Sequence, residues 1–362
     1  MIFFLILIPF ATIGIVWAFW GKFLAYWEIL LIFGVSLVAV VACKFVTEYI
    51  DSYAFEYWTN FCAKAVHDEH WTERYTTTST DKKGHTHTQT HTVHHPDQYY
   101  VVCDGDGGNV SISKSEYREI VQKFSNETKT KNWHINQVSW GDGNTFTTVA
   151  GDKQVVVTQS RHYVNKVKKS RSVFNFPDVS KEDKQEYNLV DYPVVSTLHT
   201  PSILGSPTTN QTLENEFLCF ENAKLGFSKQ IRIWIIIFKN QPVDAALKQE
   251  SYWVGGNKNE LVLCIGIDNN ESVKWGYVFS WSEEERLKVD IKNFIQEQQK
   301  LDLQLIIRYS ADESSKRWKR KEFKDFNYLH IEPSPTALFL SLLFVLAINI
   351  GLAVYSVNNQ YA

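Results

Sequence analysis

Residues 1–20 read MIFFLILIPFATIGIVWAFW, and no charged side chain interrupts them. A helix rises about 1.5 Å per residue, so about twenty apolar residues cross the hydrocarbon core of a bilayer. A cleaved signal peptide is the alternative, but the run lacks both a basic start and a small-residue cleavage site. The stretch therefore predicts a membrane-spanning helix.

A second apolar run, FLAYWEILLIFGVSLVAVVAC at residues 23–43, follows after only Gly21 and Lys22. Two spans so close together predict a transmembrane helical hairpin over residues 1–43. Glu28 falls inside the second run, close to the hairpin loop. A carboxylate within the membrane is a functional candidate, but here we expect it to reach lipid headgroups or Lys22.

A third run, PTALFLSLLFVLAINIGLAVYSV, predicts a C-terminal transmembrane helix over residues 335–357. Pro335 suits the first position of a helix. Asn349 is the strongly polar side chain of this run, and we expect it to hydrogen-bond to a neighbouring helix.

Basic residues gather just before the third run and set the expected orientation. Cytoplasmic flanks of membrane helices carry an excess of Lys and Arg, and the tail after this run, NNQYA, has no charge. We therefore expect a plasma membrane or bacterial inner membrane with the soluble portion in the cytoplasm. The alternative is that the cluster is the solvated face of a helix. The predicted membrane-surface cluster comprises Lys316, Arg317, Lys319, Arg320, Lys321 and Lys324.

Composition narrows the functional classes. The 362 residues carry a net charge of −3, whereas a general nucleic-acid-binding protein has a strong basic excess. We therefore expect no nucleic-acid partner. The 5 cysteines are scattered without a CxxC pair, which indicates buried free thiols and favours a reducing compartment.

Residues 44–70 keep a helical rhythm after the second run. We expect the second span to continue as a helical stalk that has a partner along its apolar stripe. The stripe comprises Val46, Tyr49, Tyr53, Tyr57, Phe61 and Ala65.

Residues 71–174 predict a β-rich domain, because short runs rich in Thr and Val alternate with turn sequences. DKKG at residues 81–84 predicts the turn of one hairpin, and GDGN at residues 141–144 predicts the turn of another. A short helix is expected from Ser113, where Glu116 completes a capping box.

A Pro-rich connection over residues 175–211 leads to a region of different character, residues 212–332. Helical and strand patterns there follow the order α-β-α-β-β-α, with nearly continuous apolar strands such as ELVLCIGID. Ser282 is the expected N-cap of the last helix. This order predicts an α/β domain with a helix-covered sheet. The fold class is thus membrane-anchored α+β, with three transmembrane helices, a β-rich domain and an α/β domain.

The stretch SYWVGGNKNELVLCIGID, together with this order of elements, resembles the TPM domain family over residues 212–318. In that family a helix ends in a Trp and glycines, and an Asn opens a central apolar strand. Trp253, Gly255, Gly256 and Asn259 occupy those places. The resemblance implies a membrane-anchored domain, with phosphatases and assembly or receptor-modulating factors among its relatives. It also implies a domain on the outer side, which conflicts with the basic cluster, and no catalytic residue carries over.

A His-rich strand is the most unusual feature of the soluble portion. His85, His87 and His91 share one face of a predicted strand, and imidazoles two residues apart can ligate one zinc or copper ion. They are the predicted metal site, with zinc as the cofactor. The sequence supplies no evident carboxylate or thiolate to complete the ligand shell. An exposed polar strand without a metal or other cofactor is the alternative.

No GxSxG, HExxH or paired Cys–His motif appears, so a non-enzyme is favoured while catalysis stays open. We hypothesise a membrane-anchored interaction or scaffold protein that forms a homo-oligomer. Its partners would be the lipid bilayer and another membrane or cytoplasmic protein. One alternative is a membrane-bound, metal-assisted hydrolase acting through the TPM-like domain, which needs carboxylates converging at one end of the sheet. The other is a channel or transport component.

Overall fold

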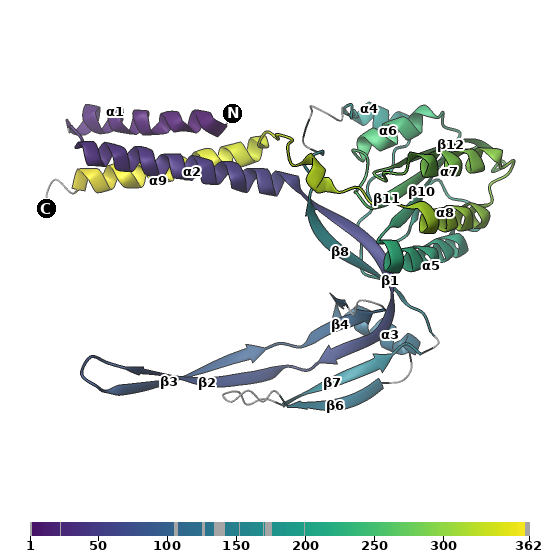
Figure 1. Ribbon diagram of the computed structural model, residues 1–362, viewed down its shortest axis with the longest axis horizontal. Coiled ribbons are helices and arrows are strands. Elements are labelled where there is room, and N and C mark those ends of the chain that lie inside the picture. Colours follow the sequence, from purple (N-terminus) through teal and green to yellow (C-terminus); the bar gives the residue numbers. More distant parts are fainter. Residues whose placement is uncertain are drawn as a thin grey trace. The chain divides into compact units, whose positions relative to one another are not determined.

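The computed structural model of the chain divides into two compact units, which are described separately (Figure 1). The first unit takes the residues up to Phe55, His162–Pro177 and the residues from Glu322 onward. The second unit takes Glu56–Arg161 and Asp178–Lys321. The structure describes residues 2–21, 23–104, 108–124, 127–133, 142–151, 153–168, 170, 176–198 and 200–358.

Apolar helices dominate the first unit. Within the described residues, three helices are long and apolar enough to cross a membrane, with mean hydropathies of 2.5, 2.7 and 2.6. α9 packs against both α1 and α2, and the helices run side by side in Figure 1. By length and composition they match the predicted spans. The helices of this unit are η1 (Ile2–Leu7), α1 (Ile8–Trp20), α2 (Tyr26–Ser52), η2 (Phe323–Phe326) and α9 (Pro335–Asn358).

A polar contact lies buried inside this helical bundle. Asn349 Nδ2 donates to Ser36 Oγ at 3.0 Å, and the Thr12 hydroxyl donates to Asn349 Oδ1 at 3.3 Å. These side chains come from α9, α2 and α1, so the prediction that Asn349 bonds to a neighbouring helix is confirmed. Glu28 accepts the backbone N–H of Ala25 at 2.8 Å and thereby caps α2. Its expected partner, Lys22, lies outside the described residues.

We expect Asn349→Leu to destabilise the bundle by about 1 kcal/mol. The substitution keeps the volume but removes hydrogen bonds between helices, which contribute about 0.6–2 kcal/mol in membrane proteins. SDS titration of the purified protein, followed by tryptophan fluorescence, measures the effect. Asn358→Leu is the matched control, because Asn358 is exposed at the end of α9. Equal stability of the two variants would contradict the prediction.

The prediction of a helical stalk over residues 44–70 is wrong beyond Ser52. α2 ends there, and Tyr53–Asp68 forms the strand β1. Apolar positions such as Tyr53 and Tyr57 lie four residues apart, and this even spacing fits one face of a strand as well as one face of a helix. Exposed and buried residues alternate along the start of β1, which is the period of a strand.

β1 continues into the second unit as the central strand of a sheet with the order β5-β4-β1-β7-β6, and β8 also pairs with β1. α3 covers this sheet with Tyr117, Ile120 and Phe124, which pack on buried Val101 and Val157. The predicted β-rich region therefore forms a helix-covered sheet. Its elements are β4 (Gln98–Cys103), β5 (Asn109–Ser111), α3 (Lys114–Phe124), β6 (Glu127–Trp133), β7 (Asp142–Val149) and β8 (Val156–Val164).

Local signals in this region hold with one exception. The predicted capping box is present, because the Glu116 amide donates to Ser113 Oγ at 3.2 Å and the Ser113 amide donates to Glu116 Oε2 at 2.8 Å. β6 and β7 form a hairpin, but GDGN is not its turn, since β7 already begins at Asp142. A Cβ on Gly143 would lie 2.9 Å from the Glu69 carbonyl oxygen. This glycine therefore permits a close backbone approach rather than a turn.

The α/β sheet has the order β12-β11-β10-β9, with β9 and β11 parallel to β10, and β12 antiparallel to β11. Helices α5, α7 and α8 cover one face with Leu and Ile, and α6 covers the other. Burial on both faces explains why the strands are apolar throughout. The elements are α4 (Lys181–Glu186), β9 (Ile203–Gly205), α5 (Gln211–Lys229), β10 (Arg232–Lys239), α6 (Asp244–Tyr252), β11 (Glu260–Ile267), β12 (Val273–Ser280), α7 (Glu285–Glu297) and α8 (Leu303–Arg317).

Three details differ from the sequence prediction. The region expected to be a plain connection contains α4 and the strand β9, which is too short for its periodicity to be visible. α8 adds a helix after the predicted order ends. Ser282 is not the N-cap of α7, because the cap is Glu284. The Ser282 hydroxyl instead accepts the Glu284 amide at 3.2 Å, just before the helix.

The partly buried carboxyl group of Glu250 on α6 is expected to make the stability of the fold depend on pH. Burial raises its pKa, although a hydrogen bond of 2.5 Å from the Tyr277 hydroxyl acts in the opposite direction. A raised carboxyl pKa stabilises the fold below the unfolded-state pKa, and this contribution is lost as pH rises through the folded-state pKa. We therefore expect Glu250→Gln, which mimics the protonated form, to raise the thermal midpoint at neutral pH. The gain should shrink at acidic pH. Exposed Glu186→Gln is the control, and a gain independent of pH would contradict the argument.

Candidate functional site

The His-rich segment forms an antiparallel ribbon, in which β2 (Trp71–Thr80) pairs with β3 (Thr86–His95) around the predicted DKKG turn. In the described part of the chain neither strand pairs with a further strand, and no residue of either strand is buried. Threonines stand directly opposite each other as Thr76–Thr90, Thr78–Thr88 and Thr80–Thr86. The ribbon therefore has open edges and one face of regularly spaced hydroxyls.

β3 is an unprotected edge strand. Natural edges are usually shielded by Lys, Pro, a bulge or a covering element, because their unpaired N–H and C=O groups invite pairing with another strand. The β3 sequence, THTQTHTVHH, has no Lys, Arg, Asp, Glu or Pro, and its register with β2 runs without a bulge. β2 differs in carrying Glu73 and Arg74 near its start. β3 is therefore the more open of the two edges to a further strand.

The structure separates the predicted metal ligands. His85 Nδ1 and His87 Nε2 lie 3.2 and 4.0 Å from Asp81 Oδ2, whereas the His91 ring stacks on Tyr75 with centroids 5.0 Å apart. His85 and His91 are six positions apart, which is about 20 Å along a strand. Asp81 is not among the predicted ligands, and the hairpin turn brings it back to these imidazoles. The backbone N–H of His85 holds the Asp81 pKa below its ordinary value.

In the described part of the chain, no group of three or more His, Cys, Asp or Glu could hold a metal ion. Zinc binding at His85, His87 and His91 stays a prediction. The Asp81 contacts explain how the two nearer imidazoles are oriented without a metal.

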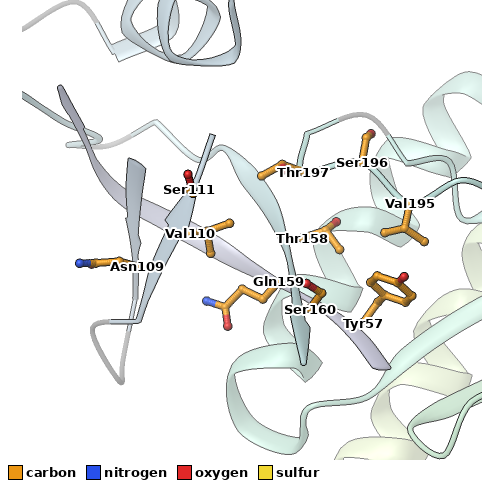
Figure 2. A pocket seen from close by; sticks show the side chains of 10 residues that line it. All are labelled: Tyr57, Asn109, Val110, Ser111, Thr158, Gln159, Ser160, Val195, Ser196 and Thr197. Atoms are coloured by element: carbon orange, nitrogen blue, oxygen red, sulfur yellow. The ribbon is translucent and has the colours of Figure 1, made fainter. Parts of the chain in front are cut away.

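A polar cleft lies beside β8 in the second unit and has a volume of about 350 Å³ (Figure 2). Figure 2 shows the β8 side chains of the cleft between β5 on one side and residues 195–197 on the other. The Thr158 backbone N–H donates to the Thr197 carbonyl at 2.7 Å, which fixes the second wall. The lining residues are Tyr57, Asn109, Val110, Ser111, Thr158, Gln159, Ser160, Val195, Ser196 and Thr197.

Two buried side chains define the floor of this cleft. Gln159 is only 8% exposed, and its Nε2 has no hydrogen-bond partner among the residues that the structure describes. Thr158 Oγ1 lies 3.5 Å from Nη1 of Arg232, a fully buried residue whose guanidinium lies 4.2 Å from the Trp234 ring centroid. Burial lowers the pKa of Arg232. Because Thr158 accepts from this cation, its own hydroxyl hydrogen is available for another acceptor.

A polar network lies behind the cleft, where the parallel strands begin. Arg232 and Glu260 are register partners in β10 and β11, so their charges offset each other. Buried Glu260 accepts the Asn257 amide at 2.7 Å and the Tyr192 hydroxyl. Burial, with Glu260 nearby, raises the pKa of Tyr192, which keeps the phenol protonated as a donor. Asn259 donates to the Gln230 carbonyl at 2.9 Å. The GGNKN sequence therefore contributes to a structural network.

Carboxylates also approach one another beyond the carboxyl ends of the parallel strands. Burial raises the pKa of Glu214, and Glu271 and Asp302 raise it further. Each neighbour has a structural partner, since Glu271 accepts the Thr209 hydroxyl at 2.8 Å and Asp302 caps α8 through the Leu305 amide at 2.9 Å. These carboxylates hold loops and a helix end.

The predicted membrane-surface cluster contains two arginines that form ion pairs within the protein. Arg317 at the end of α8 contacts Asp290 at 2.7 Å and Glu313 at 2.6 Å. Arg320 pairs with Glu56, which is fully buried, and its Nη1 donates to Gln230 at 2.7 Å. These two cations therefore hold parts of the second unit together.

A second cleft, of about 330 Å³, contains titratable groups that sequence analysis did not identify. The His67 ring stacks on Tyr99 with centroids 4.3 Å apart, and its Nε2 lies 3.7 Å from Asp97 Oδ2. The amide of His70 holds the Asp97 pKa below its ordinary value. No contiguous motif joins these residues, because they come from β1, β4, α3 and two loops. The lining residues are His67, Glu69, His70, Asp97, Tyr99, Lys114, Tyr117 and Arg118.

Comparison of the chain with protein-family models, with curated proteins and with solved structures found no match. The resemblance to the TPM family stays a prediction.

Proposed function

We propose that this chain is a membrane-anchored interaction protein that self-associates through the outer edge of β3. The observation that carries the proposal is the ten-residue edge of β3, which has no charged residue, proline or bulge to prevent pairing. The three apolar helices support the membrane anchor. The basic residues before α9 support a cytoplasmic soluble portion.

The low stability expected of an isolated ribbon supports the proposal that β3 pairs with another strand. An isolated pair of strands is marginally stable in water, because three or more strands or a packed face are needed to bury enough surface. The β2–β3 ribbon has ten residue pairs in register but no buried residue. Adding a strand on the β3 side would satisfy its outward N–H and C=O groups.

The sequence of β3 favours a second copy of the chain as that partner. Threonine occupies Thr86, Thr88, Thr90 and Thr92, so antiparallel pairing about a two-fold axis at Gln89 places threonine opposite threonine. On the opposite face the same pairing places His87 opposite His91 and Gln89 opposite Gln89 of the other copy. No like charges meet, apart from any protonated histidines. A two-fold dimer with a continuous four-stranded ribbon follows from this geometry, and it would act as the scaffold to which other proteins bind.

Mass photometry of the protein in lipid nanodiscs, with an excess of nanodiscs over protein, tests self-association. We expect a dimer with a population that rises with protein concentration. A monomer at every concentration would rule out the proposal.

A further inference from the structure

The cleft beside β8 does not take part in the proposed self-association, and its lining points to a ligand class. We infer that this cleft binds a neutral saccharide. Serine, threonine, asparagine and glutamine side chains both donate and accept hydrogen bonds, as sugar hydroxyls do. The volume of about 350 Å³ lies within the range of small-ligand sites.

Charge argues against an ionic ligand. The lining residues carry no formal charge, so a bound ion would lose its hydration without gaining a counter-charge. A buried cation, Arg232, lies behind the wall at Thr158 and stands opposite buried Glu260 in the strand register. The two charges offset each other, which leaves a polar but nearly neutral floor.

The floor has donors in place for ligand oxygens. Among the described residues, Gln159 Nε2 is buried without a hydrogen-bond partner, which is rare in native proteins and marks a position for an acceptor. Figure 2 shows the carboxamide of Gln159 extending from β8 toward β5. The adjacent Thr158 hydroxyl accepts from Arg232 and therefore has its hydrogen to donate.

Tyr57 supplies the apolar surface that sugar recognition needs. Its ring lines the cleft, and an aromatic face can pack against the C–H face of a pyranose. Burial raises the pKa of Tyr57, so the phenol stays uncharged at neutral pH. The cleft thus joins one aromatic ring to a set of uncharged hydrogen-bonding groups.

An array of immobilised oligosaccharides tests this inference on the full-length protein in nanodiscs, prepared without sugar-based detergents. The array carries neutral glycans and sialylated or sulfated glycans, and a peptide library is screened in parallel. We expect binding to neutral glycans, followed by titration calorimetry of the best one. Binding restricted to acidic glycans, binding to peptides alone, or no binding would overturn the inference.

Gln159→Leu connects the binding to the cleft. We expect at least about a tenfold loss of affinity, because the variant lacks the buried donor. The thermal midpoint should not fall, because Nε2 has no hydrogen-bond partner among the described residues to lose. Gln122 is an exposed residue of α3, so Gln122→Leu is the matched control and should bind as the wild type does. Unchanged affinity of Gln159→Leu would overturn the assignment of the cleft.

Discussion

Replacing Thr88 and Thr90 with lysine is expected to convert the proposed dimer into a monomer. In the two-fold arrangement Thr88 of one copy faces Thr90 of the other, so the double variant creates two pairs of opposed lysines. Like charges directly opposite each other destabilise strand pairing by about 0.2–1 kcal/mol per pair, and a lysine on an edge also blocks close approach. The dimer dissociation constant should rise roughly tenfold or more. Mass photometry across a concentration series measures it.

Thr76→Lys with Thr78→Lys is the matched control for this prediction. These residues stand directly opposite Thr90 and Thr88 within the same ribbon, but on β2. They have the same type of side chain on the same face, one strand spacing of about 4.8 Å further from the proposed interface. The control should therefore keep most of the dimer. Equal dissociation of both variants would point to the face of the ribbon, and no dissociation of either would point to the membrane helices.

Oxidative cross-linking adds a positional readout to the same prediction. Gln89→Cys places a thiol near the two-fold axis of the proposed β3 pairing. The native cysteines compete little, since Cys43, Cys62, Cys103 and Cys264 are buried and Cys219 is partly buried. We expect a covalent dimer after mild oxidation. Exposed Ser79→Cys on β2 is the control, and efficient cross-linking there would contradict the assigned edge.

Arg320→Met is expected to cost roughly 3 kcal/mol of stability. Arg320 pairs with Glu56, which is 1% exposed at its side chain, and removal of one partner leaves the other charge buried. Such losses are typically about 3–5 kcal/mol. We expect the lower end, because Lys258 Nζ also lies 3.6 Å from Glu56 Oε1 and Arg320 is 22% exposed. At about 2–4 °C per kcal/mol, the apparent thermal midpoint should fall by roughly 6–12 °C.

Lys324→Met is the matched control, because it removes a cation from the same predicted basic cluster. Lys324 lies 3.8 Å from Glu322, and both side chains are mostly exposed. Exposed pairs of this kind contribute about 0–1 kcal/mol. A double variant, Arg320→Met with Glu56→Gln, should recover part of the loss, since no buried charge then lacks its partner. If Arg320→Met and Lys324→Met had equal effects, the buried ion pair would not have the role assigned to it.

The sequence alone was sufficient for elements whose signal is local. The three apolar helices, the capping box of Ser113 and Glu116, and the DKKG hairpin were all predicted correctly. Each depends on residues within a few positions of one another or on an uninterrupted apolar run. Asn349 also formed the expected bond to a neighbouring helix, because a polar group in an apolar run has few other ways to be satisfied.

Prediction failed where one pattern fits two structures or where burial decides the outcome. The spacing of Tyr53 and Tyr57 fits a helix and a strand, and pairing of β1 with the strands beside it selects the strand. GDGN resembles a turn, but the carbonyl of Glu69 explains why Gly143 must be a glycine. Neither distinction can be made without knowing which segments become neighbours.

Candidate sites depended on tertiary structure more than the elements did. The histidines of β3 were visible in the sequence, whereas Asp81 became their neighbour only through the turn. Gln159 and Thr158 are ordinary residues of a predicted strand until β5 and residues 195–197 close a cleft around them. Arg320 looked like a membrane-surface cation, but its partner Glu56 lies far away in the chain.

The sequence by itself determined that this chain has apolar helices of membrane-spanning length near both ends of the stretch it covers, because a run of about twenty apolar residues carries its own signal. It also determined that β3 is a strand without protective charges. Tertiary structure decided what these features can do. Only the fold shows that, within the described residues, β3 has no second neighbouring strand and Gln159 Nε2 has no hydrogen-bond partner, and that Arg320 compensates a buried carboxylate. Each of these properties depends on which groups are shielded from water. Contacts between residues far apart in the sequence decide that shielding.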